Sequence, residues 1–173
     1  MNKPLNKSAG GIPPGRPQLL VFDFDGVLTD NRVLVLENGL EAVTCNRADG
    51  LGFEMLKSAG IQCLVISTEK NPVVAHRCKK LGVECVQGAR DKSAVLEEWC
   101  RHLGVPVEST WYVGNDLNDL RAMQFAGCSI CPADAHPAVR SVSHTTLSVA
   151  GGDGVVRAIA EDLLGLQYRP NAI

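Results

Sequence analysis

Short apolar runs alternate with longer amphipathic stretches along most of the chain. The run at residues 19–22 is continuously apolar and ends in acidic residues, which is the pattern of a strand buried on both faces of a parallel sheet. Further strands are predicted at 61–66, 83–86, 110–113 and 128–131. Helices are predicted at 51–59, 72–81, 92–103 and 117–125, as a brief turn after Asp134, and after 151–153. This alternation predicts an α/β fold, a doubly wound parallel sheet sandwich.

A different pattern separates the first strand from the first helix. Two short extended segments, 32–36 and 40–44, flank the sequence Glu37-Asn38-Gly39. Asn-Gly supplies the positive backbone angles that a tight hairpin turn needs. We therefore predict a small β-hairpin flap at this point in the chain.

Polar capping residues mark where two of the helices begin. Asn71 is a predicted N-cap, with Pro72 in the first helical position and Gly82 at the helix end. Asp134 is predicted to cap the brief helical turn that follows residues 128–131.

The length of 173 residues indicates one domain. Residues 1–17 are rich in Pro and Gly and poor in apolar side chains, so we predict a flexible N-terminal segment there. The core domain is predicted to span 18–165, and residues 166–173 to form a C-terminal tail.

Charge and composition disfavour several classes of function. There are 17 basic and 19 acidic side chains, a net charge of -2, without a basic stripe, so nucleic acid is not an expected partner. No apolar run is long enough to span a membrane, and the N-terminal residues lack the apolar core of a signal peptide. The seven dispersed cysteines favour a reducing, cytoplasmic location, and we interpret Cys128 and Cys131 as core residues of a strand.

Polar side chains follow the predicted strands where each strand ends. Asp23 and Asp25 follow the first strand, Ser67 the second, and Asp116 the fourth, while Lys92 begins the helix after the third. Each of these residues alone is explained as a turn residue, a helix cap or a solvated lysine. Together they are better explained by one pocket, because ligands bind beyond the carboxyl ends of parallel strands.

Crowded carboxylates repel one another unless a cation lies among them. Ligation by oxygen alone indicates a hard ion, and we predict Mg²⁺. A divalent ion, a lysine and a turn rich in backbone amides form a cage that stabilises a phosphoryl group in transfer. Phosphoryl transfer is therefore the predicted chemistry.

The residues that carry this chemistry also carry a resemblance. Four segments resemble, in order, the four motifs of the haloacid dehalogenase superfamily. They are the stretch Asp23-Phe24-Asp25-Gly26-Val27-Leu28-Thr29-Asp30, then Ser67, Lys92 and the stretch 114–119 (Gly-Asn-Asp-Leu-Asn-Asp). The likeness spans about residues 18–165 and implies a Rossmann-like core. Its DGVLTD signature is similar to that of the ulosonic-acid phosphate phosphatases.

The resemblance implies a role for each motif residue. Asp23 would attack phosphorus, and Asp25 would protonate the leaving alkoxide and then activate water. Ser67 and Lys92 would hold the phosphoryl oxygens.

The same resemblance implies a ligand set for Mg²⁺. The ion would be bound by Asp23, by the main-chain carbonyl of Asp25 and by Asp116, with Asp119 and Asn115 supporting these ligands from behind.

The spacing between the motifs leaves no room for a cap domain. The interval from Asp25 to Ser67 holds only the hairpin and one helix, and the later intervals each hold a helix and a strand. The pocket would stand open unless another subunit closed it. The resemblance to the ulosonic-acid phosphatases implies a homotetramer.

The sequence after Ser67 bears on the substrate. The octulosonate 8-phosphate branch of the subfamily usually has Gly-Arg there, whereas this chain has Thr68-Glu69. Glu69, with Arg77 and Lys80 on the next helix, resembles the branch that acts on nine-carbon sugar acids. A solvated helix face explains Arg77 and Lys80 equally well. We expect a phosphorylated sugar acid, a 3-deoxy-nonulosonate 9-phosphate, with the 3-deoxy-manno-octulosonate 8-phosphate as the alternative.

Three other classes fit parts of the pattern. A response-regulator receiver also has a phospho-accepting Asp, but Asp25 would hasten loss of the phosphate. A non-catalytic oligomerising domain, like those fused to cytidylyltransferases, often has decayed motifs, and here they are intact. A broader phosphomonoesterase acting on phosphoglycolate or nucleotides is the third.

Overall fold

The computed structural model describes residues 15–168. A six-stranded parallel sheet forms the centre of the molecule. The strand order is β5-β4-β1-β6-β7-β8, and every neighbouring pair is parallel. The strands are β1 (Leu19–Phe22), β4 (Gln62–Ile66), β5 (Glu84–Val86), β6 (Thr110–Val113), β7 (Cys128–Cys131) and β8 (Thr145–Thr146). The doubly wound parallel sheet that the sequence predicts is confirmed.

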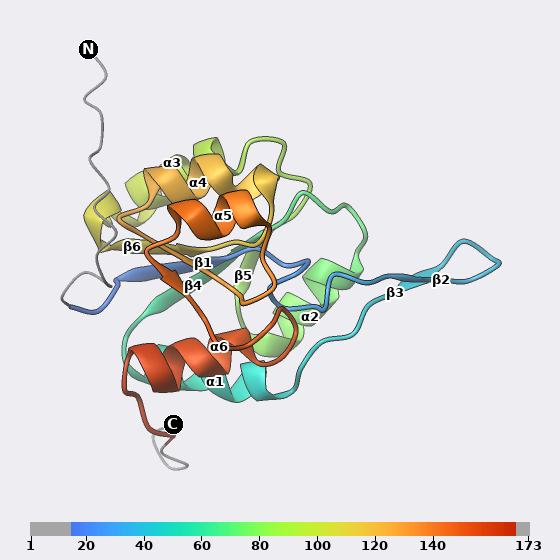
Figure 1. Ribbon diagram of the computed structural model, residues 1–173, viewed down its shortest axis with the longest axis horizontal. Helices are drawn as coiled ribbons and strands as arrows, with labels where there is room; N and C mark the ends of the chain where they lie inside the picture. Colours follow the sequence, from blue (N-terminus) through green and yellow to red (C-terminus); the bar gives the residue numbers. More distant parts are fainter. Residues whose placement is uncertain (1–14, 169–173) are drawn as a thin grey trace.

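Helices cover both faces of this sheet (Figure 1). One layer holds α1 (Ala48–Ser58), α2 (Val73–Leu81) and α6 (Val155–Ala158), which continues as a π-helical turn, Ile159–Leu163. The other layer holds α3 (Lys92–Leu103), α4 (Leu120–Phe125) and α5 (Pro137–Val142). Two short 3₁₀ turns, Val107–Ser109 and Leu117–Asp119, precede β6 and α4. No described helix has the length and apolar character needed to cross a bilayer.

Alternating side chains of the central strands supply two separate cores. Leu20 and Phe22 of β1 pack toward α1 and α6, whereas Leu19 and Val21 pack toward α3 and α4. All four are at most 1% exposed, as expected for a strand with helices on both faces. Cys128 and Cys131 are likewise buried within β7, which agrees with their interpretation as core residues.

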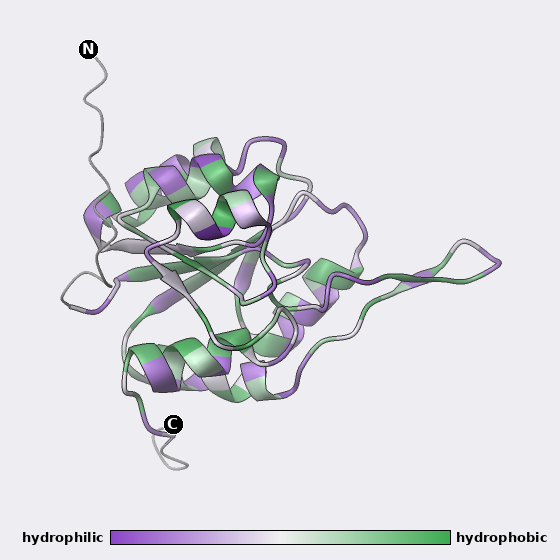
Figure 2. Cartoon of the chain, viewed as in Figure 1, coloured by the Kyte–Doolittle hydropathy of each residue, from purple (hydrophilic) through white to green (hydrophobic). Residues whose placement is uncertain are grey.

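The hairpin flap is confirmed but shorter than predicted. Its strands are β2 (Leu34–Val35) and β3 (Glu41–Ala42), which pair antiparallel around Gly39 at φ +79°. The hairpin projects from the body (Figure 1) and carries hydrophobic residues (Figure 2). Leu34 is 63% exposed and Leu40 62% exposed.

Two predicted helix caps differ in detail. The helix after Asn71 begins at Val73, one residue later than predicted, and the Asn71 side chain still accepts a hydrogen bond from the Val73 amide at 3.1 Å. The prediction of Asp134 as a cap is wrong. Its carboxylate accepts from the Gly151 amide at 2.9 Å, and His136 Nδ1 caps α5 through the Ala138 amide.

The structure extends one predicted boundary, adds a strand and leaves two boundaries untested. The first helix begins three residues before the predicted start, and β8 is an additional edge strand. The predicted flexible segment 1–17 and tail 166–173 lie largely outside the described residues, so these boundaries stay predictions.

Candidate active site

The candidate site lies where β1, β4 and β6 end side by side. Phe22, the last residue of β1, pairs with Val65 of β4 and Val113 of β6. From β1 the chain moves outward to β4 and β5, then crosses back to β6 on the other side of β1. This reversal opens a crevice at the carboxyl end of β1, and Asp23 is the first residue beyond that end.

Lys92 occupies the centre of the buried polar network. Its Nζ lies 2.8 Å from Asp23 Oδ1 and 2.8 Å from Asp119 Oδ1. The side chains are 1% (Lys92), 6% (Asp23) and 0% (Asp119) exposed. Lys92 is placed there because it is the first residue of α3. Asp91 caps this helix, and its side chain accepts hydrogen bonds from the Ser93 and Ala94 amides. Two ion pairs hold the ammonium group in one position.

The loop after β6 folds around Asp119. Asp119 Oδ2 accepts from the amides of Asn115 and Asp116 at 2.9 and 3.2 Å, and Asp119 Oδ1 accepts from the Tyr112 hydroxyl at 3.0 Å. Gly114 makes this possible, because a Cβ there would come within 2.6 Å of the Asp119 side chain. Asp119 therefore fixes both Lys92 and the loop that carries Asp116.

The turn after β1 holds Asp25 beside Asp23. The Thr29 hydroxyl donates to Asp25 Oδ1 at 3.3 Å and accepts from the Gly26 amide at 3.2 Å. Gly26 has φ +79°, and a Cβ there would collide with Asn115 Nδ2. The glycine thus allows the turn to press against the loop from β6, which closes one side of the site.

Burial shifts the titration of the central groups. Desolvation raises the pKa of Asp23 to about 8, with a further increase from Asp119 and an opposing decrease from Lys92. Desolvation also raises the pKa of Asp25, against the Thr29 hydrogen bond. Burial acts to lower the pKa of Lys92, but Asp23 and Asp119 outweigh it and raise that pKa overall.

A cavity of about 400 Å³ opens in front of this network. The predicted residues Asp23, Asp25, Ser67, Asn115 and Asp116 line it, together with Asn31, Thr68, Leu117 and Asn118. Lys92 and Asp119 lie behind this lining and contact it through Asp23 and Asn115. The structure therefore brings together all of the motif residues that the sequence places in one pocket.

Several observations fit the predicted magnesium ion. Asp23, Asp25 and Asp116 line the cavity and have only oxygen ligands in their side chains, and Lys92 pairs with Asp23 from behind. Within residues 15–168 no three acidic, His or Cys side chains form a group that could hold a metal ion by themselves; the predicted set consists of two carboxylates and the main-chain carbonyl of Asp25. Buried Asn115 Oδ1 lacks a hydrogen-bond partner among the described residues, so it can accept from a water bound to the ion.

The three predicted substrate residues are not brought together. Glu69 lies near the cavity, and its Oε1 accepts from the amides of Lys70 and Asn71 at 2.6 and 2.8 Å. Arg77 donates from Nη2 to the Asn46 carbonyl at 2.8 Å, and Lys80 is exposed on α2. The roles of Arg77 and Lys80 in substrate binding therefore stay predictions.

Thr29 and Tyr112 are site residues to which the sequence assigns no role. Tyr112 lies inside an apolar strand, so its pattern indicates only a core position. A buried tyrosine hydroxyl needs a hydrogen-bond partner, and this need is the one indication in the sequence of a further role for Tyr112. The partner is Asp119. Burial beside Asp119 and Asp23 raises the pKa of Tyr112, so it remains a neutral donor.

Comparisons with known proteins agree with this geometry. Residues 67–159 match the haloacid dehalogenase-like hydrolase family. The chain is 34% identical over 148 residues to the 3-deoxy-D-manno-octulosonate 8-phosphate phosphatase KdsC of Salmonella typhi, covering 85% of this chain and 79% of that protein.

Two solved structures show the same fold. A HAD family hydrolase from Streptomyces avermitilis superimposes with a TM-score of 0.87 at 38% identity, covering 96% of this chain and 93% of that one. The 3-deoxy-D-manno-octulosonate 8-phosphate phosphatase of Moraxella catarrhalis, in complex with magnesium, phosphate and KDO, has a TM-score of 0.82 at 33% identity and covers 86% of each chain.

The fold and the site thus define a hydrolase of the α/β class with its chemistry at the carboxyl end of the sheet. The chain belongs to the haloacid dehalogenase superfamily. The matches also confirm the prediction of a phosphoric monoester hydrolase and the resemblance to the ulosonate phosphate phosphatases.

Proposed function

We propose that the protein is a magnesium-dependent phosphatase that removes the terminal phosphate of a 3-deoxy-ulosonic acid through a phosphoryl group carried on Asp23. The observation that carries this proposal is the placement of Lys92 2.8 Å from Asp23, at the back of a cavity that Asp25, Ser67 and Asp116 also line. An ammonium group, two adjacent carboxylates and oxygen ligands for a cation are the parts that phosphoryl transfer requires.

The reaction runs in two steps on these residues. In the first, a carboxylate oxygen of Asp23 attacks phosphorus, the bond from phosphorus to the sugar oxygen breaks, and Asp25 gives its proton to that oxygen. In the second, Asp25 takes a proton from water, the water oxygen attacks phosphorus, and the Asp23 carboxylate leaves. The raised pKa of Asp25 favours the protonated form that the first step needs, and Lys92 opposes the effect of desolvation on Asp23, which must be ionised to attack.

The other groups stabilise charge during both steps. Lys92 keeps the Asp23 carboxylate oriented from behind and would offset negative charge on the phosphoryl group, and the buried Ser67 lies on the cavity wall. Asp23, Asp116 and the main-chain carbonyl of Asp25 would hold Mg²⁺. Bound there, the ion supplies the positive charge that offsets the phosphoryl group and the buried carboxylates.

Within this class we propose a 3-deoxy-nonulosonate 9-phosphate as the substrate. Its support is that Thr68-Glu69 stands where the octulosonate 8-phosphate branch usually has Gly-Arg; Glu69 lines the adjoining cavity, where a carboxylate can accept hydrogen bonds from sugar hydroxyls. The second candidate is 3-deoxy-manno-octulosonate 8-phosphate, which is favoured by the names of the relatives at 33–34% identity.

Steady-state kinetics on both sugar phosphates, with Mg²⁺ and with excess EDTA, test the proposal. We expect hydrolysis that needs the metal and a larger kcat/KM for the nine-carbon compound. A tenfold or greater preference for the eight-carbon compound would reverse the choice of substrate, and metal-independent hydrolysis would contradict the ligand set.

We also propose that the protein forms a homotetramer in which the hairpin contacts a second copy of the chain. The support is the apolar surface of the hairpin, where Val33, Leu34, Val35 and Leu40 are each more than half exposed. Light scattering at micromolar concentration should give four times the mass of one chain, and a monomeric mass would contradict this assembly.

A further inference from the structure

A second cavity, of about 280 Å³, adjoins the catalytic one on the side of the hairpin. The two cavities share Asp25 and Asn31 as lining residues. The second is walled by the hairpin, through Arg32 and Glu41, and by the segment before α2, through Glu69 and Asn71. We name it the flap pocket. A leaving group attached to a phosphoryl group at Asp23 can enter it by passing Asp25.

Hydrogen bonds fix the two glutamates of the flap pocket. Asn71 Nδ2 donates to Glu41 Oε2 at 3.2 Å, and the Asn71 side-chain oxygen is held in turn by the Val73 amide. Glu69 Oε1 accepts from the amides of Lys70 and Asn71. The hydrogen bonds among the described residues thus use one oxygen of each carboxylate and leave Glu41 Oε1 and Glu69 Oε2 for a ligand.

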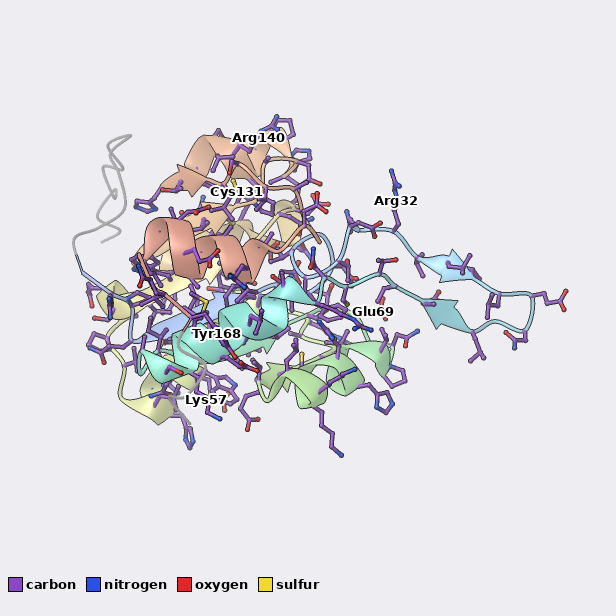
Figure 3. The ribbon with its side chains drawn as sticks, turned by 90° about the horizontal axis from the view of Figure 1, so that it is seen from below. Arg32, Lys57, Glu69, Cys131, Arg140 and Tyr168 are labelled. Carbon is purple, nitrogen blue, oxygen red and sulfur yellow. The ribbon has the colours of Figure 1, made fainter. Side chains whose placement is uncertain are left out.

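The charges of the flap pocket select the kind of group that binds there. Asp25, Glu41 and Glu69 line it against a single cation, Arg32. Figure 3 shows Glu69 beside the base of the hairpin and Arg32 extending outward from it. Carboxylate oxygens accept hydrogen bonds from hydroxyl groups and repel another anion at the same place.

We propose that the flap pocket binds the hydroxylated carbons next to the phosphoester and that Glu41, held by Asn71, is a specificity-determining residue. This inference rests on the proposed phosphatase activity and adds to it a rule for the substrate. The carbons that adjoin the phosphate carry hydroxyls, and any carboxylate of the substrate lies several carbons away, outside the pocket. A terminally phosphorylated ulosonic acid meets this rule. Phosphoglycolate, whose carboxylate adjoins the phosphorylated carbon, does not.

The variant Glu41→Gln tests the inference, because it keeps the shape of the side chain and removes its charge. Glu37→Gln, at the exposed tip of the same hairpin and outside the flap pocket, is the matched control. Three substrates are compared with Mg²⁺ present: the better of the two ulosonic-acid phosphates, phosphoglycolate, and acetyl phosphate, whose leaving group is too short to fill the flap pocket.

The first measure is the ratio of kcat/KM on the sugar-acid phosphate to kcat/KM on acetyl phosphate. In Glu41→Gln we expect this ratio to fall about tenfold, mainly through a higher KM for the sugar-acid phosphate. The reason is that one hydrogen bond from a sugar hydroxyl to a charged acceptor is weakened. The same variant should raise the ratio of kcat/KM on phosphoglycolate to kcat/KM on acetyl phosphate, since one negative charge that repels the phosphoglycolate carboxylate is removed. Glu37→Gln should leave both ratios as in the unaltered protein.

Two results would overturn the inference, and they are distinguishable from failure of the proposed function. If both ratios are the same in Glu41→Gln as in Glu37→Gln, the flap pocket does not select the leaving group, although the enzyme is a phosphatase. If the unaltered protein hydrolyses none of the three phosphorylated compounds, the proposed function and this inference fall together.

Discussion

Asp23 and Asp49 are both buried carboxylates, and their surroundings lead to different uses. Asp23 lies at the end of β1 against Lys92 and faces the 400 Å³ cavity. Asp49, in the first turn of α1, is 1% exposed and accepts from the Val156 amide at 2.9 Å, at the start of α6. Gly52 allows this close approach of the two helices, because a Cβ there would lie 2.7 Å from the Arg157 nitrogen.

The comparison shows what turns a buried acid into a reactive one. Desolvation raises the pKa of both, to about 8 for Asp23 and to about 6 for Asp49. Asp23 also has a cation in contact, a second carboxylate nearby and space for a ligand in front of it. Asp49 accepts a hydrogen bond from a backbone amide and does not line the cavity, so its charge affects the free energy of unfolding alone. Substitutions at the two sites should therefore separate activity from stability.

The largest effect is expected from Asp23→Asn. The amide keeps the volume of the side chain but is a poor nucleophile, so kcat should fall by at least about 10³-fold. The free energy of unfolding should not fall, because Lys92 retains its ion pair with Asp119 and the raised pKa of Asp23 means that its ionised form costs folding free energy. Phosphate release and urea denaturation of the same preparation measure the two quantities. Activity above a few per cent of that of the unaltered protein would show that Asp23 is not the nucleophile.

Lys92→Met is expected to damage both properties. Methionine has a similar length, but it leaves Asp23 and Asp119 without their cation in a buried site, and removal of one partner from a buried ion pair costs about 3–5 kcal/mol of folding free energy. Catalysis should be lost as well. Urea denaturation measures the first effect, with the exposed Lys57→Met as the control. A loss no greater than that of the control would mean that Lys92 does not compensate these carboxylates.

The sequence predicts the parts of the site that depend on local order. Asp23, Ser67 and Asp116 follow apolar runs, and the rule that parallel strands end at one edge places them together. Lys92 follows from its position in the first turn of a capped helix. These residues are predictable because a strand and the turn after it are contiguous in the chain.

Other features depend on contacts between distant segments and could not be predicted. The bond from Tyr112 to Asp119 requires a particular fold of the loop after β6, and the bond from Arg77 to the Asn46 carbonyl joins α2 to the segment before α1. Asp134 and His136 are both able to cap α5, and the choice is made by the Gly151 amide, which takes the Asp134 carboxylate. In each case, packing decides between groups that are equivalent in the sequence.

The smallest effect, and the one that isolates Asp49, is a change in how stability depends on pH. Desolvation raises the pKa of Asp49 from 3.8 to about 6, against the backbone hydrogen bonds from Val156 and Arg157, so the folded protein holds this proton more tightly than the unfolded chain. The stability that Asp49 contributes is therefore complete below about pH 4 and is lost as the pH rises through about 6, by at most about 3 kcal/mol.

Asp49→Asn cannot ionise, so its free energy of unfolding relative to that of the unaltered protein should rise between pH 4 and pH 7, while kcat at pH 7 stays within about twofold. Urea denaturation across this range measures the difference, and the exposed Glu54→Gln on the same helix is the control. If the relative stability of Asp49→Asn changes with pH no more than that of Glu54→Gln, then Asp49 titrates as an ordinary carboxyl. Burial alone would then not account for the raised pKa values, and the contrast with Asp23 would have to rest on Lys92 and the cavity.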